Sequence, residues 1–161
     1  MVRISRLTDY ATVLLAVLAA QPERVQTAAA LAEQTHIGAP TVSKLLKQLQ
    51  RAGLVLSTRG LHGGYQLARP ATQISAAAIL DALEGPVALT DCSVAHGHCD
   101  IEDSCRVGRV WQRLNLTIRR SLGDVSLAQL AGLDPIHTRL PVLERDVKVA
   151  VTAAPLRIPS A

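Results

Sequence analysis

Phenylalanine is absent from this chain of 161 residues, and aromatic residues make up only 2% of it. The core must therefore be built from Leu, Val, Ile and Ala, a mixture that favours helices. Proteins that bind single-stranded nucleic acid stack bases on aromatic side chains, and Tyr10, Tyr65 and Trp111 are few for that role. The sequence also lacks the run of about 20 apolar residues that a membrane-spanning helix requires.

The apolar stretch over residues 11–20 comes nearest to such a run, and its position behind Arg3 and Arg6 is similar to a secretory signal. Asp9 argues against a signal. The apolar residues also recur at the spacing of a core-facing helix: Leu7, Ala11, Leu14, Leu15 and Leu18. Three clustered cysteines are typical of a reducing compartment rather than of a secreted disulfide framework, so we expect a cytoplasmic protein.

Acidic residues are missing from residues 34–80, although the whole chain carries a formal net charge of only +4. Five basic residues fall in that segment: Lys44, Lys47, Arg51, Arg59 and Arg69. The sign then reverses over residues 81–105, which contain no Lys or Arg but six carboxylates: Asp81, Glu84, Asp91, Asp100, Glu102 and Asp103. The first segment suits a polyanion and the second a cation.

The basic segment has the pattern of a helix-turn-helix. Thr27 can cap a short helix that runs to Glu33, and Gly38 marks a turn. A second helix then ends at Gly53, with Val42, Leu45, Leu46 and Leu49 on one face. Its other face is polar and basic, as on a helix that enters the major groove: Thr41, Ser43, Lys44, Lys47 and Gln48. The alternative is a surface helical hairpin with solvated lysines.

Two β-prone runs follow, and they flank Gly60, Gly63 and Gly64. They predict a β-hairpin with a glycine-rich tip, which is the wing of a winged helix. Arg59 and His62 lie at this tip, within reach of phosphates or the minor groove. We therefore expect a mostly α fold, a winged helix-turn-helix with a two-stranded wing and a long C-terminal dimerisation helix, that binds double-stranded DNA.

Four stretches resemble the IscR and NsrR type of winged-helix iron-sulfur regulators (the Rrf family): RISRLTDYATVLLAVLA, PTVSKLLKQLQRAGLV, GLHGGYQLAR and the three cysteines downstream. The likeness covers roughly residues 1–132 and is closest to regulators of SUF iron-sulfur cluster assembly. It implies a homodimeric transcription factor, a repressor of cluster-assembly genes, whose DNA affinity depends on an iron-sulfur cluster.

The resemblance also implies roles for particular residues. It places Pro40, Thr41, Ser43 and Lys44 at the DNA-reading positions of the helix and Arg59 at the wing arginine, and we add Lys47 and His62 to the expected contacts. Some members read bases with a Tyr and a Glu where this chain has Thr41 and Ser43, so the operator sequence does not carry over.

All the cysteines of the chain lie within residues 92–105: Cys92, Cys99 and Cys105, with six and five residues between them. A structural zinc site with His96 or His98 is one reading, although zinc ligands usually pair across two to four residues. A thiol switch is a second reading, but the nearby carboxylates do not lower a thiol pKa. An iron-sulfur cluster held by the three thiolates is the third and, with the family resemblance, the favoured one.

The fourth ligand of such a cluster differs within the family. IscR-like members carry a histidine three residues after the third cysteine, where this chain has Gly108. NsrR-like members use an aspartate near the N-terminus of the partner subunit, and Asp9 occupies the matching position. His96 and His98 are local rivals for the role. Three cysteines do not decide the nuclearity; we expect 2Fe-2S rather than 4Fe-4S.

Residues 106–123 predict a long helix with one apolar side, which either closes the chain's own core or pairs with a second copy: Val107, Val110, Trp111, Leu114, Ile118 and Leu122. A short helix over residues 126–131 follows. We expect a DNA-binding domain over residues 1–85, a cysteine loop over 86–106, dimerisation helices over 107–132 and a weakly structured tail over 133–161. A cysteine-dependent enzyme would need an oxyanion hole, which no motif suggests, and an electron carrier would need no basic helix, so we expect no enzyme.

Overall fold

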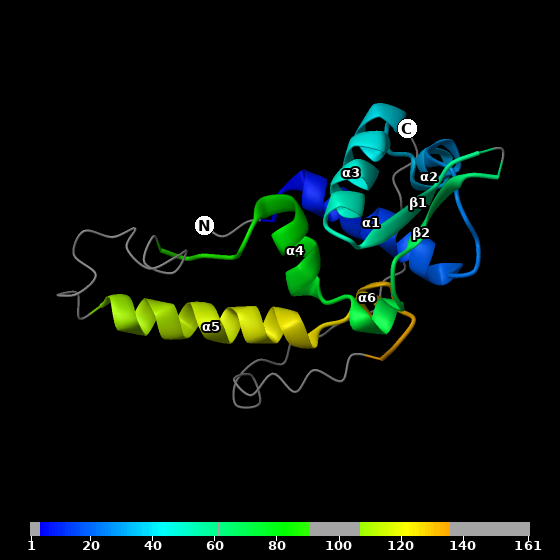
Figure 1. Ribbon diagram of the computed structural model, residues 1–161. Helices are drawn as coiled ribbons and strands as arrows, with labels where there is room; N and C mark the ends of the chain where they lie inside the picture. The colour runs from blue at the N-terminus through cyan, green and yellow to red at the C-terminus, as the bar shows by residue number, and fades with distance from the viewer. Residues whose placement is uncertain (1–3, 61, 91–106, 136–161) are drawn as a thin grey trace.

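The computed structural model describes residues 4–60, 62–90 and 107–135 (Figure 1). Within them the order of elements is helix, helix-turn-helix, hairpin and three further helices. The bounds are α1 Arg6–Ala20, α2 Ala28–Thr35, α3 Ala39–Arg51, β1 Val55–Thr58, β2 Gly64–Leu67, the 3-10 turn η1 Ala71–Gln73, α4 Ala76–Glu84, α5 Gly108–Asp124 and α6 Leu127–Leu130. No described helix is both long and apolar enough to cross a membrane. The prediction of a mostly helical winged helix with a two-stranded wing is confirmed.

The N-terminal helix α1 contributes several of the buried residues of the core. Ser5 caps it by accepting a hydrogen bond from the amide of Thr8 at 3.2 Å. Ala11, Leu14 and Leu15 are fully buried, as their spacing predicts. Leu7 was expected on the same face but is 40% exposed, because it lies in the first turn, where the described part of the chain does not cover it.

The helix-turn-helix is formed by α2 and α3. Thr27 caps α2, and His36 ends it in the left-handed conformation at φ 55°. Pro40 then lies in the first turn of α3, where a missing N–H costs nothing. The predicted core face of α3 is confirmed: Val42, Leu45, Leu46 and Leu49 are all completely buried. The packing of these four side chains fixes which face of α3 points outward.

The wing is the antiparallel pair of β1 and β2, in which Val55 pairs with Leu67 and Thr58 with Gly64. A short antiparallel bridge attaches β2 to the residues that precede α2. The amide of Gln26 donates to the Tyr65 carbonyl at 2.9 Å, and the amide of Tyr65 donates to the Gln26 carbonyl at 2.8 Å. Gly64 lies so close to Gln26 that a Cβ there would be 2.6 Å from its carbonyl oxygen. Gly63 and Gly64 are therefore required by close backbone packing, whereas Gly60 is required by its φ of 114°.

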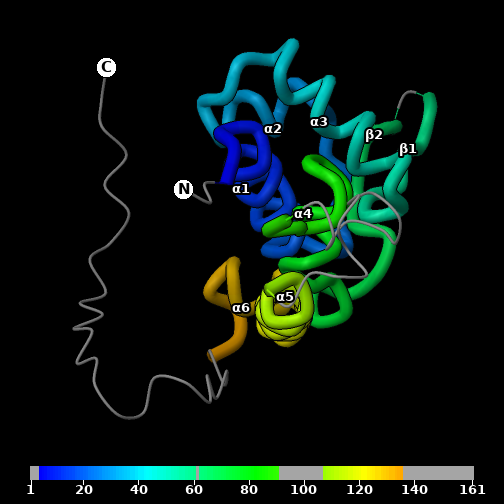
Figure 2. The backbone as a smooth tube through the Cα atoms, turned by 90° about the vertical axis from the view of Figure 1, so that its left-hand side faces the viewer, coloured from blue at the N-terminus to red at the C-terminus, as the bar shows by residue number. Residues whose placement is uncertain are grey.

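Helix α4 was not predicted, and it lies between the other helices and α5 (Figures 1 and 2). Ser75 caps it, and Ile79 and Leu80 pack into the core. At its C-terminal end, one carboxylate oxygen of Glu84 accepts hydrogen bonds from the Thr8 hydroxyl and, at 2.9 Å, from the Ser5 amide. These two donors lower the pKa of the Glu84 carboxyl below its usual value.

The long helix α5 was predicted and is confirmed, beginning two residues later than expected. Seen along its axis in Figure 2, it lies beneath α4, on one side of the molecule. α6 follows after a single turn and packs on α1, with Leu127 fully buried. The bounds of α6 fall within the predicted residues 126–131.

We predict that Gly63→Ala lowers the thermal unfolding midpoint. A Cβ at residue 63 would collide with the Thr58 carbonyl oxygen and lie 2.9 Å from that of Gly60, so the wing would have to deform. Forced overpacking of this kind typically costs about 1 to 3 kcal/mol. Scanning calorimetry of the purified variant measures the change.

Gly123→Ala is the matched control, because a Cβ there meets nothing within 4 Å and the residue lies inside α5. Gly123 lies in the last turn of α5, where alanine should stabilise the helix by less than the roughly 0.5 to 1 kcal/mol typical of the middle of a helix. The two substitutions should therefore shift the midpoint in opposite directions. Equal midpoints for Gly63→Ala and the wild type would contradict the described wing geometry.

Candidate nucleic-acid interface

The outward face of α3 carries a shallow hollow of about 360 Å³, lined by Pro40, Ser43, Lys44, Lys47, Gln48 and Arg51. Because the opposite face of the helix is completely buried, these side chains cannot turn inward. No ion pair in the described part of the chain joins Lys44, Lys47 or Arg51 to a carboxylate. The face therefore presents a row of unneutralised positive charges to an external partner.

The predicted reading residues on α3 differ in exposure. Pro40, Lys44 and Lys47 are exposed, whereas Thr41 and Ser43 are half-buried. Gly38 is the N-cap of α3 and supplies no side-chain cap to its first amides. A helix N-terminus whose amides are not capped by a side chain favours a phosphate oxygen.

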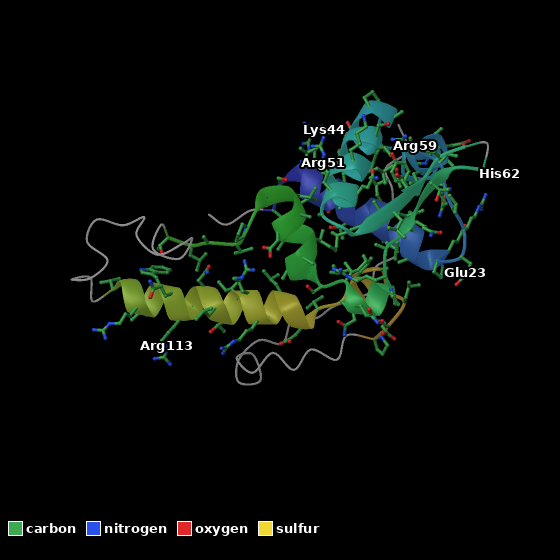
Figure 3. The ribbon with its side chains drawn as sticks, in the orientation of Figure 1. Glu23, Lys44, Arg51, Arg59, His62 and Arg113 are labelled. Atoms are coloured by element: carbon green, nitrogen blue, oxygen red, sulfur yellow. The ribbon has the colours of Figure 1, made fainter. Side chains whose placement is uncertain are left out.

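The wing contributes the other predicted contacts. Arg59 and His62 are both exposed, and Figure 3 shows His62 at the far end of the hairpin. The Gln50 side-chain amide donates to the Ser57 hydroxyl at 2.9 Å, which links α3 to β1. The helix and the wing therefore form one unit. Five of the seven predicted DNA contacts lie on α3, Arg59 directly follows β1, and His62 lies beyond it at the tip.

Arg51 was missed as a candidate contact. It lies seven residues after Lys44, about two helical turns, so both project from the same side of α3 (Figure 3). The spacing would have identified it from the sequence, as it identified Gln48, which lies one turn beyond Lys44. Both residues belong to the same exposed face of α3.

The predicted cofactor residues lie largely outside the described residues. This applies to Cys92, Cys99 and Cys105 and to His96 and His98. Asp9 is described: it is exposed in the first turn of α1 and lines a pocket of about 360 Å³ together with Thr8 and Thr12. Over residues 4–60, 62–90 and 107–135, no group of three or more His, Cys, Asp or Glu side chains is placed to hold a metal ion.

The described residues on either side of the cysteine segment are both attached to α5. The amide of Leu89 donates to the side-chain oxygen of Asn115 at 3.3 Å, and Asn115 is 4% exposed although it is polar. Gly108, which the resemblance compares with a histidine ligand, is the first residue of α5 and is buried. Segments entering and leaving the cysteine region thus lie on the same helix.

Helix α5 exposes most of the apolar side chains that were expected to line one of its sides. Val107, Val110, Trp111, Leu114 and Ile118 are 60%, 59%, 42%, 46% and 37% exposed. Over residues 4–60, 62–90 and 107–135, this stripe therefore does not close a core. Ile118 and Leu122 continue the stripe into a pocket of about 360 Å³ that also includes Ile4, Leu80 and Glu84.

The chain is similar to transcriptional regulators. A helix-turn-helix-type transcriptional regulator of Neisseria meningitidis is 38% identical over 63% of this chain and 68% of its own length. The regulator IscR of Sodalis glossinidius is 32% identical over 73% of this chain and 68% of its own. The solved structure of IscR from T. potens superposes with a TM-score of 0.60 at 26% identity, covering 85% of this chain and 92% of that one.

A family model confirms the relationship suggested by the helix-turn-helix, the wing and the cysteine spacing. The model described as Rrf2, iron-dependent transcriptional regulator, matches residues 4–132, which is most of the chain. Its relatives are transcriptional regulators, in agreement with the expectation that the chain is not an enzyme. The protein belongs to the Rrf2 family of transcriptional regulators.

Proposed function

We propose that the protein is a homodimeric repressor of iron-sulfur cluster assembly genes that senses an iron-sulfur cluster and binds palindromic operator DNA. The observation that carries the proposal is the unneutralised basic face of α3, linked to the wing by the bond between Gln50 and Ser57 in a member of a family described as iron-dependent. DNA binds to this face of α3. The iron dependence of the family makes the cysteines the expected ligands of the cluster.

The first turns of α3 read bases in this proposal. In helix-turn-helix proteins the N-terminal part of the second helix contacts base edges. Thr41, Ser43 and Lys44 occupy that part here, and Lys is one of the side chains that recognise guanine. Lys47 and the wing residues Arg59 and His62 contact phosphates, which fix the register without reading sequence.

The exposed apolar face of α5 is occupied by a second copy of the chain. A contiguous apolar patch of this kind marks an interaction surface. A dimer with a two-fold axis presents two α3 helices to two half-sites of a palindrome. The adjacent pocket lined by Ile4, Leu80 and Leu122 extends the apolar surface from α5 towards α1, so the partner contacts both helices.

The cluster is held by Cys92, Cys99 and Cys105, with Asp9 of the partner subunit as the fourth ligand. Three thiolates and one carboxylate match the donor types that iron-sulfur sites accept, and a carboxylate ligand leaves the cluster labile. The exposure of Asp9 in the first turn of α1 supports the assignment, because a buried carboxylate would not reach another subunit. When bound, a 2Fe-2S cluster supplies a centre whose loss or oxidation changes the charge beside α5.

The DNA contacts can be tested by salt dependence. Lys44→Ala and Arg59→Ala should each weaken binding to the promoter DNA upstream of the protein's own gene. Arg59→Ala should also lower the log-log salt slope by about one unit, as expected for a lost phosphate contact, whereas Lys44→Ala should relax the sequence preference. Gel-shift titrations at several salt concentrations give the slope.

Arg113→Ala is the matched control for these variants. It removes the same charge from an exposed position of α5, on the side facing away from α3 (Figure 3), and should leave the affinity and the slope unchanged. Wild-type affinity in both Lys44→Ala and Arg59→Ala would overturn the proposed placement of DNA.

The dimer can be tested with Leu114→Asp. Leu114 is 46% exposed in the isolated chain, so the charge should not disturb the protomer, but it would be buried without a partner in a dimer. Sedimentation should find a monomer, with helix content unchanged by circular dichroism. Leu56→Asp, at a position 49% exposed on the wing, is the control and should stay dimeric. A dimeric Leu114→Asp protein would refute the role of α5.

The cluster is tested by anaerobic purification and assay of iron, sulfide and visible absorbance. Replacing Cys92, Cys99 or Cys105 with alanine should abolish stable binding, because two thiolates rarely hold a cluster. Asp9→Ala should keep the dimer but alter or lose the spectrum, while His96→Ala and His98→Ala should keep it. A normal spectrum in Asp9→Ala with loss in a histidine variant moves the fourth ligand into the loop, and zinc without sulfide in the wild type replaces the cluster with a structural zinc site.

A further inference from the structure

Helix α4 packs against the DNA-binding part of the chain. We call this part the head and define it as α1, α2, α3 and the β1–β2 hairpin. Ile79 and Leu80 are 1% and 9% exposed, so one face of α4 is fixed in the core. Its last residue, Glu84, accepts hydrogen bonds from Ser5 and Thr8 at the N-terminus of α1. The middle and the C-terminal end of α4 are thus held against the head.

The joint between α4 and α5 lies at one end of both helices. The amide of Ala76, the first residue of α4, donates to the Val125 carbonyl at 2.8 Å, and the amide of Leu127 donates to the Ile74 carbonyl at 2.7 Å. These bonds form a bridge in which Ser75 and Ser126 pair antiparallel. A two-bond bridge between short segments fixes the position of the joint but does not by itself fix the angle between the helices.

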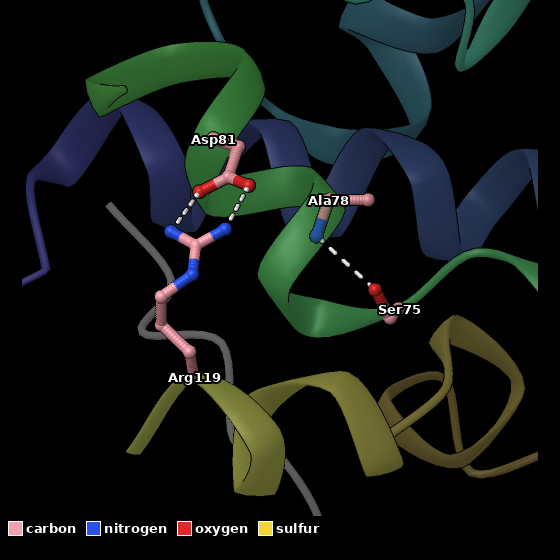
Figure 4. A network of polar contacts seen from close by, with 4 residues as sticks. All are labelled: Ser75, Ala78, Asp81 and Arg119. Atoms are coloured by element: carbon pink, nitrogen blue, oxygen red, sulfur yellow. Dashed lines mark hydrogen bonds and ion pairs between the residues drawn. The ribbon is translucent and has the colours of Figure 1, made fainter. Parts of the chain in front are cut away.

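A second contact between the two helices lies away from this joint. The Arg119 guanidinium of α5 donates to both carboxylate oxygens of Asp81 on α4, Nη1 to Oδ1 at 3.2 Å and Nη2 to Oδ2 at 3.0 Å (Figure 4). Asp81 is about 9 Å along its helix from Ser75, and Arg119 about 10 Å along its own from Ser126, at 1.5 Å per residue. These two distances are nearly equal, so the ion pair and the joint form a triangle in which the ion pair lies opposite the joint.

The geometry of this pair suits an angular restraint. A bidentate pair between a planar guanidinium and a carboxylate constrains orientation as well as distance. The two side chains are 34% and 35% exposed, so the pair contributes little to overall stability. Among the described elements α5 packs mainly on α4. Asn115 of α5 also accepts a hydrogen bond from Leu89, in the segment that follows α4, but Asp81–Arg119 is the one ion pair between α4 and α5 in the described part of the chain.

We propose that the Asp81–Arg119 pair is a positioning device that sets the angle between the head and α5, and thereby the spacing of the operator half-sites that the dimer accepts. The proposal rests on the proposed function, because α5 must join two copies for the angle to become a distance between two α3 helices. Neither residue touches DNA; both act through the position of α3.

The test measures affinity for palindromic operators whose half-sites are moved together or apart by one base pair. The operator is first selected from random DNA with the wild-type protein, and its single half-site is measured alongside. A helix-turn-helix dimer discriminates half-site spacing, and we expect the wild type to lose about 10-fold or more in affinity per displaced base pair, within the usual range of coupling energies.

Two single variants and a charge swap should separate positioning from folding. Arg119→Ala and Asp81→Asn should weaken binding at the natural spacing about 5-fold and reduce the penalty for displaced half-sites to about 3-fold or less, with half-site affinity unchanged. Asp81→Arg combined with Arg119→Asp restores the pair with the charges exchanged and should restore much of the spacing preference. Arg113→Ala, which removes an exposed arginine from the same helix, should behave as the wild type.

The outcomes are distinguishable. A wild-type spacing profile in both single variants, or a charge swap that recovers nothing although its thermal midpoint matches the wild type, overturns the positioning role alone. A wild-type protein that binds a single half-site as tightly as the palindrome overturns dimeric operator reading, and the positioning role with it. If Arg119→Ala fails to fold, Asp81→Asn and the charge swap decide between these outcomes.

Discussion

The packing of α4 between the head and α5 is the constraint on which the rest of the structure depends. Helices α3 and α5 lie on opposite sides of α4, as Figures 1 and 2 show. Ile79 and Leu80 join α4 to the core, and Asp81 on the next position joins it to α5. Adjacent residues of one short helix therefore join the core that supports α3 to α5, and α6, which packs on α1, provides a second connection.

Local signals explain why most of the fold was predictable from the sequence. Thr27 and Pro40 act on their own neighbours, the glycines mark the turn between two β-prone runs, and the spacing of Val42, Leu45, Leu46 and Leu49 needs only a core on one side. The exposure of Leu7 and the existence of α4 were not predicted. Spacing shows that Leu7 can face a core but not what covers it, and α4 depends on contacts with residues about 40 and 80 positions away.

The candidate site was also predictable only in part from the sequence. The absence of acidic residues over 34–80 predicted an unneutralised α3, and in the described residues Lys44 and Lys47 have no carboxylate partner. The roles of these residues, of Asp9 and of the cysteines stay predictions, as do the domain boundaries. The fourth ligand in particular depends on the arrangement of two subunits, and no spacing within one chain encodes that arrangement.

Two of the six carboxylates in residues 81–105 have contacts of their own in the structure. Asp81 is paired with Arg119, and Glu84 accepts two hydrogen bonds at the N-terminus of α1, where a negative charge is also favoured by the helix dipole. Both carboxylates therefore have structural roles, and neither is free to attract a cation. The like-charge argument against a reactive thiol then rests on the carboxylates that lie among the cysteines themselves: Asp91, Asp100, Glu102 and Asp103. Four carboxylates within a segment of 15 residues that holds three thiols disfavour free thiolates, and a metal centre that neutralises those thiolates removes the conflict.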